Sequence, residues 1–134
     1  MLSSPPLATF EKVKEALLEA LEHLEAEEVT LTASLKKDLE AESFDFLDIV
    51  FRLEKTFDLQ IERVELMAEE IISNPAHSSN DVLTAAGVKA LRERQPWRNP
   101  NVFVAGEEHP NDITVQELCQ YIEWKIAQKA ETII

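Results

Sequence analysis

Only two of the 134 residues are glycine, and this scarcity restricts the folds open to the chain. Glycine supplies the positive-φ positions of tight hairpin turns and of the loops that wrap phosphate groups. The chain is therefore a poor candidate for a sheet of many hairpins or for a glycine-rich nucleotide loop. Because 45% of its residues are hydrophobic, enough for one core, we expect a single, mainly helical domain over residues 1–134.

The first part of the chain is predicted to hold two amphipathic helices. Residues 1–8 are expected to be disordered, and Thr9 is the expected N-cap of the first helix. A second helix should begin at Ser43, whose hydroxyl can accept from the free amides of the first turn. Between them, 27–42 lacks helical periodicity and is expected to be an ordered loop. The predicted inner face of the second helix is Phe46, Ile49, Val50, Leu53 and Phe57.

The second part is predicted to hold three further helices. A short one is expected over 62–72, and another from Asn80, its N-cap, to about Gln95. Residues 96–112 contain three prolines and the β-prone run Val102-Phe103-Val104, and are expected to be a structured loop. The last helix opens on a capping box of Thr114 and Glu117. Its predicted inner face is Val115, Leu118, Ile122 and Ile126.

The net charge of −13 limits the partners of the chain. Such a field repels nucleic acid phosphates and anionic lipid surfaces, so we expect neither as a partner. Residues 1–72 hold 7 basic and 18 acidic side chains, which places a net charge of −11 in the first half. Basic proteins are the partners that this charge favours.

Cysteine content and the start of the sequence predict a cytoplasmic protein. Cys119, the single cysteine, has no partner for an intrachain disulfide. The opening residues lack the basic and apolar regions of a signal peptide. No apolar run approaches the roughly 20 residues that a membrane-spanning helix needs, so no membrane span is expected.

The residue pattern predicts neither an enzyme nor a metal site. His23, His77 and His109 lie far apart in sequence, and none is at metal-ligand spacing with another or with Cys119. We expect these histidines on surfaces or loops, and Cys119 as a small buried hydrophobe in a helix. Ser43 lacks the G-x-S-x-G setting of a hydrolase nucleophile, so any reaction at its hydroxyl would need a second protein.

The middle of the chain resembles the acyl carrier protein family. Members of that family have an ordered loop, a D-S-L motif opening an acidic second helix, and an E-x-x-F-[DG] ending. The corresponding residues here are Glu42-Ser43-Phe44, Asp48, Glu54, Phe57 and Asp58. Departures from the family pattern are Glu42 for aspartate, Phe44 for leucine and Glu40 for a glycine. The resemblance covers residues 9 to about 66 and 113 to about 128, and implies an all-α helical bundle.

The resemblance also implies a function. Ser43 would carry 4′-phosphopantetheine, transferred from coenzyme A by a separate phosphopantetheinyl transferase that uses Mg²⁺. An acyl group would be held on it as a thioester for fatty acid and lipid biosynthesis. The helix that follows would dock on basic patches of acyl-loading enzymes, synthases and acyltransferases. The residues with this implied docking role are Glu42, Asp45, Asp48, Glu54 and Asp58.

Residues 73–112 would be an insertion, one helix and a loop, before the last helix of such a bundle. The run Phe44–Phe51 most resembles the specialised carriers that hold very-long-chain acyl groups for lipid A. Because each buried methylene is worth about 0.8 kcal/mol, a long chain favours a larger apolar site. Candidate residues for this acyl pocket are Phe46, Val50, Leu53, Trp97 and Phe103.

Two other interpretations of the sequence remain open. The chain could be a carrier for polyketide or peptide synthesis, or an acidic interaction module that is never modified. In the insertion, Arg92, Arg94 and Arg98 form a basic cluster that we expect to be a solvated helix end, with a contact to phosphate or an acidic partner as the alternative.

Overall fold

The structure, a computed structural model, describes residues 6–110 and 112–133. These residues form two compact units: 6–61 with 112–133, which we call the bundle unit, and 62–110, which we call the insert unit. The mainly helical fold is confirmed, and the single small sheet of the described residues lies in the insert unit. The second unit starts before residue 73, the predicted start of the insertion. That the two units form one domain stays a prediction.

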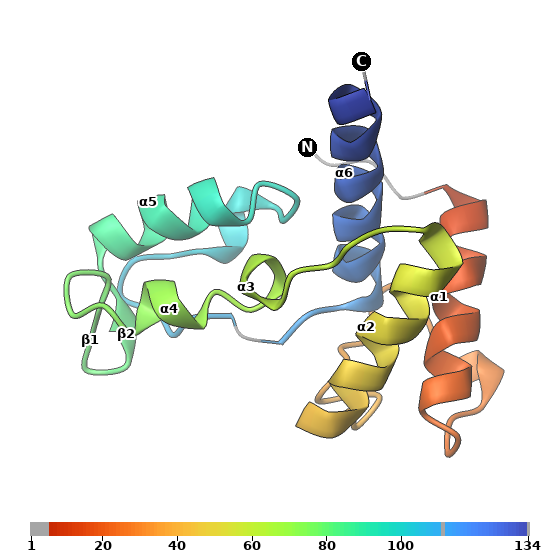
Figure 1. Cartoon of the computed structure of the whole chain (residues 1–134). Coiled ribbons are helices and arrows are strands. Elements are labelled where there is room, and N and C mark those ends of the chain that lie inside the picture. The colour runs from red at the N-terminus through yellow and green to blue at the C-terminus, as the bar shows by residue number, and fades with distance from the viewer. Residues whose placement is uncertain (1–5, 111, 134) are drawn as a thin grey trace. The chain divides into compact units, whose positions relative to one another are not determined.

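Three helices form the bundle unit: α1 (Leu7–Ala20), α2 (Ser43–Phe57) and α6 (Val115–Ile133). α1 packs against both α2 and α6 and runs in the opposite direction to them (Figure 1). Apolar side chains from all three helices and from the loop between α1 and α2 make the core. Its fully buried large members include Leu17, Leu21, Leu39, Ile49, Leu53, Leu118, Tyr121 and Ile122.

The start of α1 differs from the prediction. The helix begins at Leu7, so Leu7 and Ala8, which we expected to be disordered, are helical, and Pro6 occupies the N-cap position. Thr9 is not a cap: it lies inside the helix, is buried, and its hydroxyl donates a hydrogen bond to the Glu123 carboxylate of α6. No side chain caps this helix; Pro6 has φ of −56°, and its carbonyl accepts the first helical hydrogen bond, from the Phe10 amide at 3.1 Å.

The loop that follows α1 begins at 21, earlier than the loop predicted over 27–42, and it contains one 3₁₀ turn, η1 (Ala26–Glu28). Its backbone is tied to the segment that leads into α6: the Leu35 amide donates to Ile113 O at 2.8 Å, and the Val115 amide donates to Ala33 O at 2.9 Å. Two apolar side chains of the loop itself, Val29 and Leu39, are buried. This loop therefore fixes the approach of the chain to α2.

The capping box at the start of α6 is confirmed. The Thr114 amide donates to Glu117 Oε1 at 3.0 Å, and the Glu117 amide donates to Thr114 Oγ1 at 3.1 Å. The predicted inner face is correct for Val115, Leu118 and Ile122 but wrong for Ile126, whose side chain is 38% exposed.

The insert unit is made of short elements: α3 (Arg63–Leu66), α4 (Glu69–Ile72), β1 (Ser78–Ser79), β2 (Val82–Leu83), α5 (Ala85–Arg94) and η2 (Pro100–Val102). The single helix predicted over 62–72 is in fact two one-turn helices, and the β-prone run at 102–104 forms no strand. A small apolar cluster holds the unit together, formed by Ala68, Leu83, Val88, Leu91 and Phe103.

The helix predicted to have Asn80 as its N-cap begins four residues later than expected, at Ala85, with Thr84 as its N-cap. Asn80 and Asp81 instead form the turn of an antiparallel hairpin in which Ser79 pairs with Val82. Both have positive φ, +52° and +67°, a conformation that asparagine and aspartate adopt more readily than other non-glycine residues. An Asn-Asp pair supports a two-residue hairpin turn as well as it supports a cap, and this turn was not predicted.

Candidate functional site

Ser43 is the first residue of α2, and its side chain is exposed. It does not cap the helix, which corrects the prediction. Glu42 is the N-cap residue, and it forms a capping box with Asp45. Asp45 Oδ2 accepts a hydrogen bond from the Glu42 amide at 2.9 Å, and the Glu42 carboxylate accepts from the Asp45 amide. The hydroxyl of Ser43 is therefore not used in starting the helix.

The loop before Ser43 passes through a left-handed residue. Glu40 has φ of +56°, a conformation that glycine adopts without steric cost. This is the position at which the acyl carrier family has glycine, so the backbone keeps the same bend although the residue differs. The Ala41 amide donates to Leu35 O at 2.8 Å, which holds the loop next to the start of α2.

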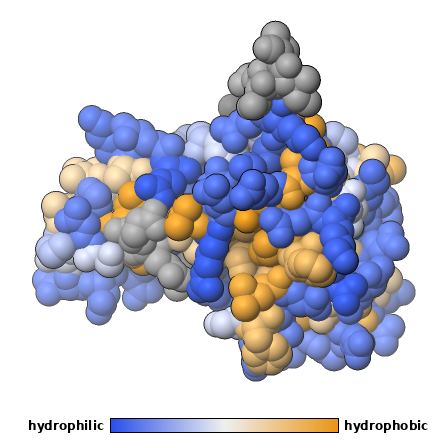
Figure 2. Space-filling model, in the orientation of Figure 1, coloured by the Kyte–Doolittle hydropathy of each residue, from blue (hydrophilic) through white to orange (hydrophobic). Residues whose placement is uncertain are grey.

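Beside Ser43, α2 presents a stripe of exposed apolar side chains. Phe44, Leu47 and Phe51 are 68%, 60% and 53% exposed, whereas Ile49 and Leu53 are fully buried. Spacing of three and four residues places the exposed three on one face of the helix. Figure 2 shows hydrophobic surface gathered over the beginning of α2. The stripe was not predicted, although its three-four spacing is visible in the sequence.

The five carboxylates predicted to dock partners all make contacts within the bundle unit. Glu42 and Asp45 form the capping box. Asp48 pairs with Arg52 at 3.1 Å, and Glu54 Oε2 accepts from the Ile61 amide at 2.9 Å. Asp58, left-handed at the end of α2, pairs with Lys129 at 3.0 Å. These acids thus help to shape and anchor α2. Although it is paired, the Asp58 side chain is almost fully exposed.

The candidate acyl-pocket residues fall in both units. In the bundle unit Leu53 is fully buried, while Phe46 and Val50 are half-buried. In the insert unit, Trp97 and Phe103 are both buried.

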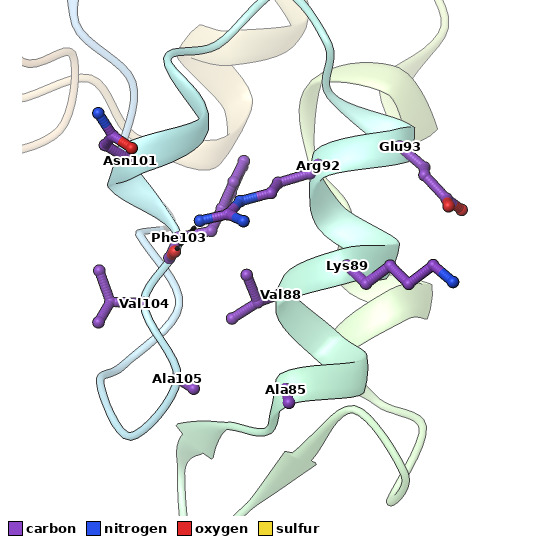
Figure 3. Close-up of a pocket in the computed structure, with 9 residues that line it drawn as sticks. All are labelled: Ala85, Val88, Lys89, Arg92, Glu93, Asn101, Phe103, Val104 and Ala105. Atoms are coloured by element: carbon purple, nitrogen blue, oxygen red, sulfur yellow. Dashed lines mark hydrogen bonds between the residues drawn. The ribbon is translucent and has the colours of Figure 1, made fainter.

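Phe103 also lines an open pocket of about 540 Å³ in the insert unit, between α5 and the segment that follows η2. The apolar lining of this pocket includes Val88 and Val104. Arg92 reaches across it to the Phe103 carbonyl (Figure 3), and it also donates to Pro100 O at 3.1 Å.

Arg98 is not at a solvated helix end, which corrects the expectation for the basic cluster. Its side chain is buried, donates to Pro110 O at 2.8 Å, and lies over the Phe103 ring with 5.4 Å from Cζ to the ring centroid. Buried Gln95 donates to Leu66 O at 2.9 Å. Arg98 and Gln95 therefore hold loops of the insert unit in place, which is a structural role.

The described residues contain no group of three or more histidine, cysteine or acidic side chains placed to hold a metal ion. His23 contacts Leu39 O and His77 contacts Ile71 O through ring nitrogens at 3.2 and 2.8 Å. Cys119 is fully buried in α6. Burial, with a smaller contribution from the nearby Glu123 carboxylate, raises the pKa of its thiol to about 12.

Cys119 is therefore expected to resist alkylation in the folded protein, because the thiolate is the reactive form and is scarce at any pH near neutral. Iodoacetamide at pH 8 should leave the native chain unlabelled over the time in which it fully labels the chain in 6 M guanidinium chloride. The readout is intact mass with and without denaturant. Labelling at equal rates in both conditions would contradict the burial of the thiol.

Comparison with known proteins adds to this geometry. The family model described as phosphopantetheine attachment site matches residues 11–74, a range that includes Ser43 and all of α2. The acyl carrier protein of Petrotoga mobilis is 35% identical over 74 residues, which are 55% of this chain and 86% of that protein. The chain belongs to the acyl carrier protein family. The acyl carrier protein of Streptococcus pyogenes serotype M3 is 44% identical over 59 residues, 44% of this chain and 77% of that protein. No solved structure matches the chain.

Membership of the family sets the chemistry of the site. Acyl carrier proteins are not enzymes; they carry covalently attached 4′-phosphopantetheine, and they interact with phosphopantetheinyl transferases and with acyl-handling biosynthetic enzymes. This chain offers what the group needs, an exposed serine hydroxyl at the start of a helix. The first amides of a helix have no intrahelical acceptor and are suited to phosphate oxygens. Among the described helices, none is both long and hydrophobic enough to cross a membrane.

Proposed function

We propose that this chain carries an acyl group as a thioester on 4′-phosphopantetheine attached to Ser43, and delivers it to enzymes of fatty acid and lipid biosynthesis in the cytoplasm. The observation that carries the proposal is the exposed hydroxyl of Ser43 at the first position of α2. The match of the attachment-site family model to residues 11–74, a range that includes α2, also supports the proposal.

Attachment is a group transfer from coenzyme A. The Ser43 Oγ forms a bond to the phosphorus that bears pantetheine, the bond from that phosphorus to 3′,5′-ADP breaks, and the hydroxyl proton passes to a base of the transferase. The product is a phosphodiester with one negative charge. The positive end of the α2 dipole and the amides of its first two residues are suited to stabilise that charge.

Partner enzymes would dock on α2 through the exposed apolar stripe of Phe44, Leu47 and Phe51, with the acidic residues beside it. The stripe supplies exposed apolar area, since more than half of each of its three side chains is open to solvent. Asp48, Glu54 and Asp58 lie along α2 and at its end, where they would attract a basic patch and speed the encounter. A carrier that must bind briefly and leave is served by this combination.

The cargo we propose is a long acyl chain, including the very-long-chain groups of lipid A. The similarity of the run Phe44–Phe51 to carriers of that kind supports it, together with the insert unit, which carries Trp97, Phe103 and an apolar pocket of about 540 Å³. In the bundle unit, the proposed lining for the acyl group is Phe46, Val50 and Leu53, on the inner side of α2.

Intact mass spectrometry tests the attachment. The purified chain is incubated with coenzyme A, Mg²⁺ and either a broad-specificity transferase or the transferase of its native host. The wild-type chain is expected to gain the mass of one phosphopantetheine and Ser43→Ala none, while the control Ser34→Ala gains it as the wild type does. Failure of both transferases to modify the wild-type chain, or a gain of mass by Ser43→Ala, would overturn the proposal. Acyl groups found on protein from the native host then identify the cargo.

A further inference from the structure

We propose that the pocket of the insert unit binds a free fatty acid of medium chain length, with the alkyl chain against Val88 and Val104 and the carboxylate at Arg92. The pocket lies between α5 and the segment that follows η2, and all of its lining belongs to the insert unit. Binding of a free acid there does not depend on the proposed attachment at Ser43, so the two can be tested separately.

The lining of the pocket is mainly apolar. Val88 and Phe103 belong to the apolar cluster that holds the insert unit together, so packing fixes the buried part of the lining. Val104, which is 43% exposed, continues the lining toward solvent together with Ala85 and Ala105. These side chains are suited to an alkyl chain, because each methylene that they fully remove from water strengthens binding by about fourfold.

Arg92 supplies a positive charge inside the pocket. Figure 3 shows its side chain reaching from α5 across the pocket, whereas the side chains of Lys89 and Glu93 point away from the segment that follows η2. The guanidinium donates to Pro100 O at 3.1 Å and to Phe103 O at 3.4 Å, and no carboxylate of the described side chains pairs with it. These two contacts hold the guanidinium in place, leave its charge uncompensated, and use only some of its N–H donors.

The combination selects an amphiphile with one anionic group. A guanidinium can donate two parallel hydrogen bonds to a carboxylate, whereas a thioester or an alcohol has no negative charge to offer it. Because the chain has a net charge of −13, its overall field repels an anion, so binding must come from these local contacts. We therefore expect a free acid to bind more tightly than an uncharged compound with the same alkyl chain.

The size of the pocket favours a small molecule over a protein segment. Its volume of about 540 Å³ is within the range of small-molecule sites, about 300–1,000 Å³. Nine residues line it, fewer than the roughly 20–30 that a stable protein interface uses on each side. An acidic segment of a partner protein is the alternative occupant.

Calorimetric titration of the unmodified full chain with octanoate, decanoate and decanol, each below the concentration at which it forms micelles, tests the site. Decanoate is expected to bind about fourfold more tightly than octanoate, since each of two further methylenes contributes about twofold when half of it is buried. Decanol is expected to bind about tenfold more weakly than decanoate, because it lacks the charge that Arg92 pairs with. Amide chemical shifts of Val88, Phe103 and Val104 should change on titration.

Variants separate the charge of Arg92 from the shape of the pocket. Arg92→Gln is expected to bind decanoate about tenfold more weakly and decanol within twofold of wild type. Decanol thus reports whether the variant keeps its fold. Arg63→Gln is the matched control: it makes the same chemical change at an exposed position of the insert unit that does not line the pocket, and it should bind both compounds as the wild type does. Val104→Ser should weaken both compounds by about threefold, because it removes part of the apolar lining.

Four results would overturn the inference. Equal affinity for decanoate and decanol would contradict a carboxylate site, and equal losses for Arg92→Gln and Arg63→Gln would assign the effect to net charge. Chemical shift changes confined to the bundle unit around Leu53 would place the alkyl chain there. A failure of decanoate to bind would favour an acidic protein segment as the occupant. Ser43→Ala should bind decanoate as the wild type does, so none of these results bears on the attachment at Ser43, which the gain of mass decides.

Discussion

Replacing Gly87 with alanine is expected to destabilise the insert unit by about 3 kcal/mol or more, although alanine is the better helix former. A Cβ at this position would lie 2.0 Å from the carbonyl oxygen of His77 and 2.8 Å from its carbon. That backbone cannot move aside freely, because His77 O accepts from the Thr84 amide at 3.0 Å and the His77 amide donates to Asn74 O at 2.9 Å. Overpacking of this kind typically costs 1–3 kcal/mol, and contact with fixed backbone is at the severe end.

Tryptophan fluorescence can isolate this effect. In a Trp124→Phe background, Trp97 is the remaining tryptophan and reports the insert unit. Urea unfolding followed at Trp97 therefore measures how much Gly87→Ala lowers the free energy of unfolding of that unit. Lys89→Ala, at an exposed position of the same helix, is the control and should change the free energy of unfolding by less than about 0.5 kcal/mol. Helix propensity alone predicts that Gly87→Ala stabilises by roughly 1 kcal/mol, so a stabilised variant would contradict the close approach of His77.

Local sequence patterns predicted the elements whose partners lie nearby in sequence. The capping box of Thr114 and Glu117 is complete within four residues, so the sequence was enough to find it. Helix propensity alone makes glycine unfavourable at position 87, and the reason for it, the close approach of the His77 carbonyl, comes from a segment ten residues earlier that local patterns do not place. Asn80 fits both a helix cap and a hairpin turn. Only the pairing of β1 with β2, the strands on either side of it, decides between the two.

Local sequence patterns were also insufficient at α2, the helix of the candidate site. The start of α2 at Ser43 was predicted, but three residues within four positions can cap it, and the choice of Glu42 with Asp45 over Ser43 depends on backbone geometry that begins at Glu40. Apolar residues occupy nearly every side of α2 in its first turns. Periodicity predicted the face buried around Ile49 and Leu53, but it did not show that the apolar residues left outside that face form an exposed stripe that begins at Phe44.

Leu53 connects the stability of α2 with the proposed acyl pocket. Its side chain is fully buried, so Leu53→Ala is expected to lower the free energy of unfolding of the unmodified chain by about 2–5 kcal/mol, through lost burial and the cavity left behind. If the acyl chain lies beside Leu53, that cavity gives it room, and each methylene that enters contributes about 0.8 kcal/mol. A dodecanoyl group on Ser43 should then stabilise Leu53→Ala more than it stabilises the wild type.

Urea unfolding of chains loaded by a transferase with either acetyl or dodecanoyl pantetheine measures this difference, since acetyl is too short to fill the cavity. Phe44→Ala is the matched control on the same helix: its side chain is 68% exposed, so both its stability and its response to acylation should follow the wild type to within about 0.5 kcal/mol. Equal stabilisation of Leu53→Ala and wild type by dodecanoyl would place the acyl chain away from Leu53.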